Sequence, residues 1–262
     1  MGLLCETGRW ITGMSKNVSI MISGGLDSYI MDRYATVNGF NSTLIYVNLG
    51  HPYVESEKKA IKIAGFDAIE INMEALYPAI EKRLSNQIIP SRNMLFAVVG
   101  SMFNPRVWLG ALDGEQHGKE HDKSRRFFDD ASSLLSYTNE FFQAETIIET
   151  PFSHLTKAGT IEWALSTGGI SKEDLLRTSS CYSGHETPCG VCLTCYKRWA
   201  AFLLNDIVET GHEANPWESD YAKEMAQEIP KAHKAGDHSR FTPSRIDEWF
   251  DVREKMKTLG IS

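Results

Sequence analysis

The strongest constraint on the fold is a glycine turn that joins a short apolar segment to a helical pattern. Residues 17–22 are rich in Val and Ile, Ser-Gly-Gly-Leu-Asp-Ser occupies positions 23–28, and helical spacing runs from Asp27 to about Asn38. This order predicts a strand, a turn and a helix. Glycines in such a turn permit a positive φ and let an anion approach the backbone N–H groups. The positive end of the helix then points to the same place.

The polar side chains of this turn favour a nucleotide site over an ordinary tight turn. Ser23 and Ser28 supply hydroxyl donors, and Asp27 is placed to hold a divalent cation that neutralises phosphates. The GxxxxGK[ST] pattern is absent, which disfavours γ-phosphoryl transfer of that class. We therefore predict that one loop binds ATP and Mg²⁺, and its residues are Ser23, Gly24, Gly25, Leu26, Asp27 and Ser28.

The chain continues by alternating strand patterns with helical patterns. Helices are predicted at 55–64, 94–103 and 157–166, and further strands at 43–49, 67–72, 106–110 and 147–149. Such alternation implies parallel strands joined by right-handed crossovers. We therefore predict an α/β fold with a doubly wound parallel sheet for residues 17–211, after an amino-terminal extension at 1–16.

A change of character after Gly211 predicts a helical extension at 212–262. A helix at 196–209 precedes it, Tyr221 opens an apolar stripe with four-residue spacing that stops ahead of Pro230, and Thr242-Pro243 begins a second amphipathic helix. Stripes of this kind usually serve burial, so we expect packing on the domain or on a second subunit. A homodimer is compatible with this pattern, and a tail that binds a protein partner is the alternative.

Four of the five cysteines follow the pattern C-x7-C-x2-C-x2-C over residues 181–195. Four thiolates on short loops complete a tetrahedral zinc site with no open position, which predicts a structural role. An iron–sulfur cluster, which four thiolates also hold, and a redox disulfide are the alternatives. Cys5 stands apart, without a predicted role. The predicted Zn²⁺ ligands are Cys181, Cys189, Cys192 and Cys195.

Composition narrows the partners and the location. The chain has 262 residues, with 27 basic and 34 acidic side chains and a net charge of −7. This balance disfavours nucleic acid as a partner, although a metal knuckle is present. No apolar run approaches the length of about 18 residues that a membrane helix needs. The first residues lack the layout of a secretory signal, so we expect a cytoplasmic protein.

In their order along the chain, these motifs resemble the 7-cyano-7-deazaguanine synthase family of the ATP pyrophosphatase (PP-loop) superfamily. In that family the glycine loop is followed by a Pro-x-Arg-Asn segment, here Pro90–Asn93, and by a Thr-Lys pair before a helix, here Thr156-Lys157. A cysteine cluster ahead of an arginine comes last, and that arginine is Arg198 here. The resemblance runs from about Val18 to Phe202.

The resemblance implies an adenine nucleotide alpha hydrolase-like fold and an ATP-dependent carbon–nitrogen ligase. Such an enzyme converts 7-carboxy-7-deazaguanine and ammonia to the nitrile through an adenylated carboxylate and an amide. Asp27, Lys157 and Arg92 would be catalytic: Lys157 stabilises charge on the α-phosphate, and Arg92 clamps a phosphate or the substrate carboxylate. Without the resemblance, Lys157 would be read as solvent-facing and Arg92 as a capping or pairing residue. Asn93, Asp122 and Arg125 are the implied substrate residues.

Two segments depart from the family pattern. Residues 120–125 replace a Tyr-Pro-Asp-Cys-Arg-like stretch and keep only Asp122 and Arg125, and residues 50–55 replace a segment with Gln and His. Both follow predicted strands, where ligands bind in open α/β sheets. The substrate, or a stop at the amide, is therefore left open. His117, His121 and Asp122 offer a second metal site, but a solvated loop is the favoured reading.

Two other functions remain alternatives to the deazaguanine synthase. One is another adenylating ligase or a sulfur transferase of the same superfamily that uses a different acceptor. The other is a non-catalytic effector whose carboxyl-terminal helices bind a protein partner.

Overall fold

The computed structural model describes residues 16–84, 89–113, 121–140, 145–181, 183 and 187–261. Cys5 and His117 lie outside these residues, as does nearly all of the predicted extension at 1–16. The backbone of His121 is described, but its side chain is not, so the proposed second metal site is not tested.

The described strands form a single parallel sheet in the order β3-β2-β1-β4-β5. This confirms the predicted doubly wound parallel sheet. The chain leaves β1 toward β2 on one side and returns to β4 on the other, so the topological switch point lies between β1 and β4. The strands are β1 (Asn17–Met21), β2 (Asn41–Asn48), β3 (Ile69–Asn72), β4 (Arg106–Trp108) and β5 (Ile147–Glu149).

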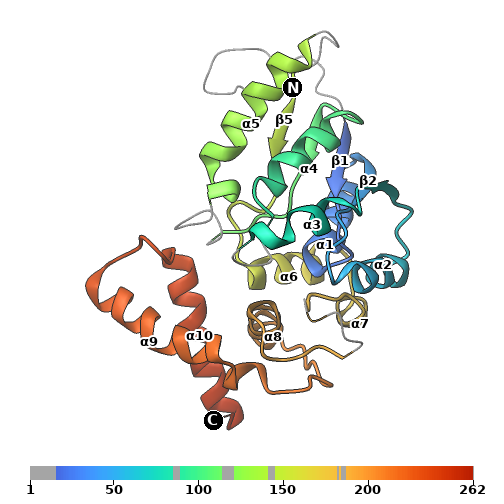
Figure 1. The fold of residues 1–262 in the computed structure, drawn as a ribbon. Coiled ribbons are helices and arrows are strands. Elements are labelled where there is room, and N and C mark those ends of the chain that lie inside the picture. Colours follow the sequence, from blue (N-terminus) through green and yellow to red (C-terminus); the bar gives the residue numbers. More distant parts are fainter. Residues whose placement is uncertain are drawn as a thin grey trace.

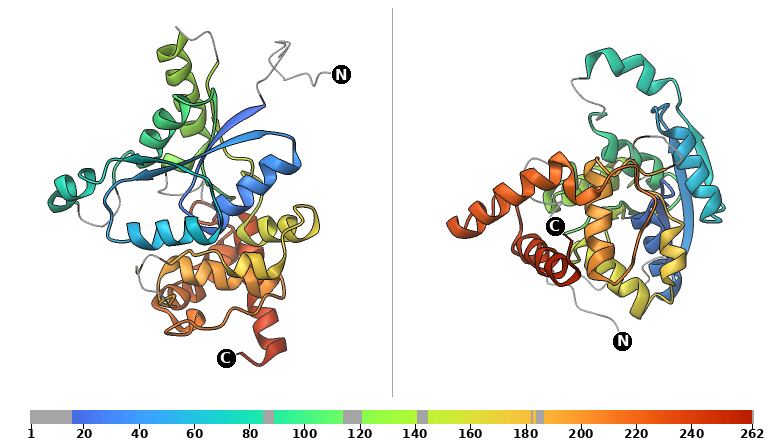
Figure 2. Two further views of the ribbon diagram at one scale, coloured as in Figure 1. Left: turned by 90° about the vertical axis from the view of Figure 1, so that its right-hand side faces the viewer. Right: turned by 90° about the horizontal axis from the view of Figure 1, so that it is seen from below.

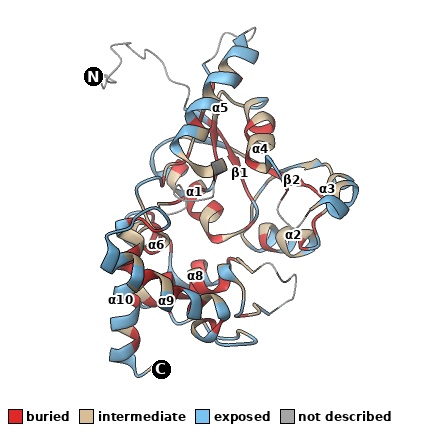
Figure 3. Ribbon diagram, turned by 60° about the vertical axis from the view of Figure 1, so that its left-hand side comes forward, coloured by how far each residue is buried: buried red, intermediate tan, exposed pale blue. Residues whose placement is uncertain are grey.

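Helices cover both faces of the sheet, as Figure 1 shows. Successive residues of β1 point to opposite faces: Ile20 packs in the cluster that includes α1 (Leu26–Val37) and α6 (Lys157–Ser166). Met21 packs in the cluster that includes α4 (Arg92–Ser101) and α5 (Arg125–Thr138). Because both faces are covered, the central strand β1 is buried from Val18 onward and the carboxyl half of β2 is buried, whereas β3 at the edge of the sheet has no buried residue (Figure 3).

Further helices complete the fold, and the structure corrects several predicted bounds. They are α2 (Val54–Ile63), α3 (Leu76–Ile80), α7 (Lys172–Leu176), α8 (Leu193–Leu204), α9 (Asp220–Ala235) and α10 (Pro243–Leu259), with single 3₁₀ turns at Glu81–Arg83, His121–Lys123 and Pro216–Glu218. The α8 helix begins earlier than the predicted 196–209, with Cys192 as its N-cap, and it ends earlier because Asp206 adopts a φ of 54°. The α9 helix continues through Pro230 and ends at Gly236, whose φ is 62°.

The carboxyl-terminal helices pack on the rest of the chain. Trp199 and Leu203 of α8 form a cluster with Ala222 of α9 and with Val252 and Met256 of α10. Figure 2 shows both helices beside α8. The packing interpretation of the apolar stripe is therefore confirmed. None of the helices in the described part of the chain combines the length and apolarity needed to cross a bilayer.

Candidate active site

A cavity of about 470 Å³ lies at the carboxyl ends of the central strands. Its walls include the turn after β1, Gly110 after β4, and residues of α2, α4, α6 and α8. Ligands of open α/β sheets bind at the carboxyl edge beside the switch point, and this cavity occupies that place. The fold therefore brings the predicted loop to the expected position.

The glycine turn is shaped by contact with α2. Gly24 has a φ of 71°, and an added Cβ would lie 2.5 Å from the backbone nitrogen of Ile61. Gly25 instead has a φ of −76° and is the N-cap of α1, so only the first glycine uses the freedom that we expected of both. No side chain caps α1 within the described residues. Its first backbone N–H groups therefore suit an anion in the cavity.

An ion pair joins two of the predicted catalytic residues. The Nζ atom of Lys157 lies 2.6 Å from Oδ1 and 2.8 Å from Oδ2 of Asp27. Thr156 is the N-cap of α6 and accepts a hydrogen bond from the N–H of Gly159, which places Lys157 at the first helical position. The side chain of Lys157 is only 11% exposed. The interpretation of Lys157 as a solvent-facing residue is therefore wrong.

The Pro-x-Arg-Asn segment at residues 90–93 contributes another part of the cavity wall. Ser91 has a φ of 56°, an unusual value for a residue other than glycine, and it is the N-cap of α4. Arg92 and Asn93 follow at the start of the helix and line the cavity. The amide of Asn93 donates to the carbonyl oxygen of Asp122 at 3.0 Å, so these two predicted substrate residues are in contact.

Arg92 lacks a partner for one buried donor, whereas Arg125 lies elsewhere. The Nε atom of Arg92 is buried without a hydrogen-bond partner among the described residues, and its guanidinium lies 6.0 Å from the ring centroid of Phe96. Arg125 begins α5, has a side chain that is 89% exposed, and pairs with Asp129 at 3.5 Å. It is not among the residues that line the cavity, so the structure does not bring it to the other predicted substrate residues.

Several cavity residues were not predicted from the sequence. The hydroxyl of Tyr46 donates to Oε2 of Glu57 at 3.0 Å, and burial raises the pKa of Glu57 to about 7 although Tyr46 and Arg92 both act to lower it. Burial, together with the charge of Arg92, lowers the pKa of His51 to about 4. Glu57 lies on a polar helix, and no motif separates it from its exposed charged neighbours. Lys197 also lines the cavity, next to the cysteine cluster.

The four cysteines of the predicted metal site lie together. Their Sγ atoms are all within 4.8 Å of one another, and those of Cys181 and Cys189 are 3.6 Å apart. Zn–S bonds of about 2.3 Å in a tetrahedron place sulfur atoms about 3.8 Å apart, so the arrangement fits a bound ion. Backbone N–H groups of Ser183 and Cys189 both donate to the Cys181 sulfur at 3.4 Å, as expected around a thiolate ligand.

Two further contacts hold residues 181–195, called the metal loop here, against the segment at 213–214. Gly190 has a φ of 74°, and an added Cβ would lie 1.7 Å from the carbonyl oxygen of Ala214. The N–H of Glu213 donates to the carbonyl oxygen of Pro188 at 2.9 Å. Cys181 also lines the cavity, so the metal loop forms part of the active-site wall.

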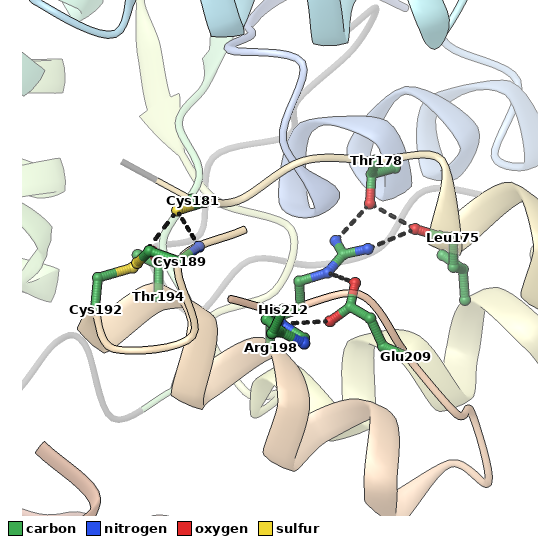
Figure 4. Close-up of polar contacts among 9 residues, drawn as sticks. All are labelled: Leu175, Thr178, Cys181, Cys189, Cys192, Thr194, Arg198, Glu209 and His212. Atoms are coloured by element: carbon green, nitrogen blue, oxygen red, sulfur yellow. Dashed lines mark hydrogen bonds and ion pairs between the residues drawn. The ribbon is translucent and has the colours of Figure 1, made fainter. Parts of the chain in front are cut away.

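A buried network beside the cysteine cluster holds the segment that leads into the cavity (Figure 4). Arg198 contacts Glu209 at 2.6 Å, donates to the hydroxyl of Thr178 at 2.7 Å and donates to the carbonyl oxygen of Leu175 at 3.0 Å. His212 lies 3.3 Å from the second oxygen of Glu209. Arg198, the arginine that follows the cysteine cluster, therefore holds the chain in place just before residues 179–181. Those residues line the cavity.

The fold and this site define a PP-loop α/β protein with a four-cysteine metal loop. The family model described as "Queuosine biosynthesis protein QueC" matches residues 67–206, more than half of the chain. The chain belongs to this family.

Individual relatives agree with this assignment. A 7-cyano-7-deazaguanine synthase of Marinomonas sp. (strain MWYL1) is 25% identical over 214 residues, which cover 72% of this chain and 94% of that protein. A 7-cyano-7-deazaguanine synthase of Caulobacter sp. (strain K31) is 27% identical over 226 residues, which cover 70% of this chain and 90% of that protein. The solved NMN synthetase of Francisella tularensis aligns with 93% of this chain and 86% of its own, at 13% identity and a TM-score of 0.41. That last likeness is too slight to bear on function.

Proposed function

We propose that this protein is an ATP-dependent ligase that converts 7-carboxy-7-deazaguanine and ammonia to 7-cyano-7-deazaguanine. One observation carries the proposal: in a member of this family, the glycine turn, the Asp27–Lys157 ion pair and Arg92 line one cavity. A carboxylate is a poor electrophile, and transfer to the α-phosphate turns its oxygen into a leaving group. The cavity provides cationic donors where that transfer would occur.

The reaction proceeds in two activations. A substrate carboxylate oxygen attacks the α-phosphate of ATP and pyrophosphate leaves, and ammonia then attacks the acyl carbon, displaces AMP and loses a proton to give the amide. A second ATP activates the amide oxygen in the same way. The adenylated amide then loses AMP and both N–H protons to give the nitrile, so each product consumes two ATP molecules and one ammonia.

Each of the cavity residues would have a separate role in this reaction. The glycine turn and the start of α1 would hold the pyrophosphate group, and Asp27 would hold Mg²⁺, which neutralises phosphate charge. Lys157 would stabilise charge on the α-phosphate, and its ion pair with Asp27 keeps it inside the cavity before ATP binds. Arg92 would bind the substrate carboxylate through the guanidinium that lines the cavity. Zn²⁺ in the cysteine site would hold the wall between α7 and α8.

Replacement of Asp27 tests this proposal. Asp27→Asn keeps the shape of the side chain and removes its charge, so we expect AMP release in the presence of the deazaguanine acid and ammonium to fall about 100-fold or more. Chromatography of the nucleotides measures this release. Asp32→Asn, on the same helix but outside the cavity, is the matched control and should retain activity. Undiminished AMP release by Asp27→Asn would refute the assigned role.

A second candidate is an enzyme that stops at the amide. The observation in its favour is that both segments that depart from the family pattern contribute to the cavity, through His51 and Tyr53 and through Asp122 and Lys123. Mass spectrometry of the product distinguishes the two, because the nitrile lacks the elements of water that the amide retains. The amide as the final product with excess ATP would replace the nitrile in the proposal.

A further inference from the structure

Part of the cavity is suited to a flat heterocycle. Tyr46, Tyr53 and Phe96 contribute aromatic rings to its walls, and the ring of His51 lies 4.7 Å from that of Tyr53 between centroids. Aromatic walls favour planar ligands by stacking. The partly buried carboxylate of Glu57 lies in the same lining. A carboxylate beside aromatic rings can accept hydrogen bonds from the polar edge of a base that stacks on those rings.

The hydrogen bonds of Glu57 leave it able to accept from a ligand. Tyr46 donates to Oε2 at 3.0 Å and is the only hydrogen-bond partner of this carboxylate among the described residues. This bond fixes the orientation of the carboxylate and leaves Oε1 and a second lone pair on Oε2. The positive charge of Arg92 favours the ionised form, against the effect of burial.

The two bases that the proposed reaction brings to the cavity differ in what they offer such a carboxylate. A deazaguanine presents two adjacent donors, N1–H and the 2-amino group, which an ionised carboxylate accepts together. Adenine presents one donor, the 6-amino group, next to an acceptor, N1, which a carboxylate repels. The charge and geometry of Glu57 therefore match the substrate acid better than ATP.

We propose that Glu57, oriented by Tyr46, binds the N1–H and 2-amino edge of the deazaguanine and so determines the base specificity of this enzyme. The inference rests on the proposed function and deepens it by assigning the residue that selects the substrate. Glu57 is a specificity residue here, distinct from Asp27, Lys157 and Arg92, which act on the phosphates and the carboxylate.

Calorimetric binding of two acids tests the assignment. The probes are 7-carboxy-7-deazaguanine and the matching acid without the 2-amino group, and ATP is titrated separately. We expect the intact protein to bind the first acid about 10- to 100-fold more tightly than the second, because the second leaves a carboxylate lone pair unpaired. In Glu57→Gln this ratio should fall close to one, while affinity for ATP stays within about twofold of the original. Glu55→Gln, an exposed carboxylate on the same helix, is the matched control and should keep the full ratio.

Each other outcome has a distinct meaning. The inference is overturned if Glu57→Gln keeps the original ratio of affinities for the two acids, or if it loses affinity for ATP while binding both acids as before. Either result leaves the proposed function standing. An intact protein that binds ATP but neither acid overturns the proposed function, and the inference falls with it. Tyr46→Phe removes only the orienting hydroxyl, so it tests the same idea if Glu57→Gln does not fold, and it should lower the ratio about threefold or more.

Discussion

Burial sets opposite protonation states on two neighbouring side chains of the cavity. The pKa of Glu57 is raised to about 7, and the pKa of His51 is lowered to about 4, so burial opposes the charge on each. His51 is therefore neutral at physiological pH, while Glu57 titrates there. A ligand that needs the ionised carboxylate must displace a proton from Glu57 below pH 7.

Affinity for the substrate acid should consequently rise with pH. Because the acid selects ionised Glu57, its binding should weaken by up to about tenfold per unit below pH 7 and level off above it. The pKa of Tyr46 is raised by burial and that of His51 is lowered to about 4, so neither of these side chains titrates in this range and produces the effect. Calorimetry at pH 6, 7 and 8 in two buffers measures both affinity and proton release. A flat profile in the intact protein, or the same slope in Glu57→Gln, would contradict the prediction.

At the level of elements, the cysteine cluster joins the segment after α7 to α8, and both line the cavity. Cys181 follows the segment after α7, and Cys195 lies inside α8, so one ion would hold both. A metal that binds only the folded chain stabilises it by about 4 kcal/mol when its free concentration is 1,000 times its dissociation constant. For a chain of this size such a change corresponds to about 8–16 °C in melting temperature.

Removal of the metal should therefore lower the melting temperature by about 10 °C. Elemental analysis of the purified protein should give one zinc per chain, and a strong chelator should produce the fall, followed by scanning calorimetry. Cys189→Ser is the control: it should start near the lower temperature and respond little to the chelator. Brown protein with iron and broad visible absorption would replace zinc by an iron–sulfur cluster.

An element could be predicted from the sequence when the residues that determine it are neighbours along the chain. The strands and α1 were predictable because the apolar run of β1 and the glycine turn are contiguous. The α5 helix was not predicted although Phe128, Ala131 and Leu135 have helical spacing, because polar residues also occupy its inner face. There Ser132 and Ser136 donate to carbonyl oxygens of the strand segment at β5, contacts that only the folded chain reveals.

The same distinction applies to the site. Asp27 could be singled out from the glycine turn and Lys157 only through the family resemblance, and their contact joins residues 130 positions apart. Glu57 had no local signature at all, since its environment depends on Tyr46 and Arg92 from other elements. Short motifs therefore indicated the residues for which we propose phosphate binding, whereas Glu57, for which we propose contact with the base, could be found only from the fold.

At the scale of the whole molecule, the carboxyl-terminal helices and the sheet domain share contacts that tie their stabilities together. The cluster between α8, α9 and α10 contains Trp199 and Val252, exposed by 6% and 1%. Lys255 of α10 contacts Asp206 at 2.5 Å, and Ser244 donates to Asp113 in the segment after β4. The α8 helix also packs on α6, which carries Lys157 at its start. Residues 212–262 are thus connected to the cavity through two layers of packing.

Truncation of Met256 should therefore destabilise the entire chain. This residue is 4% exposed in the cluster on α8, so Met256→Ala should cost about 2–5 kcal/mol of unfolding free energy. Leu259→Ala, on the same helix but 57% exposed, is the matched control and should cost about 0.5 kcal/mol or less. Urea titration followed by hydrogen exchange with mass spectrometry resolves β1 from α10. Because α8 packs both in the cluster that contains β1 and in the cluster that contains α10, both should unfold at the same lowered urea concentration. Early unfolding of α10 with β1 unchanged would instead make the extension a separate unit, free to serve a partner.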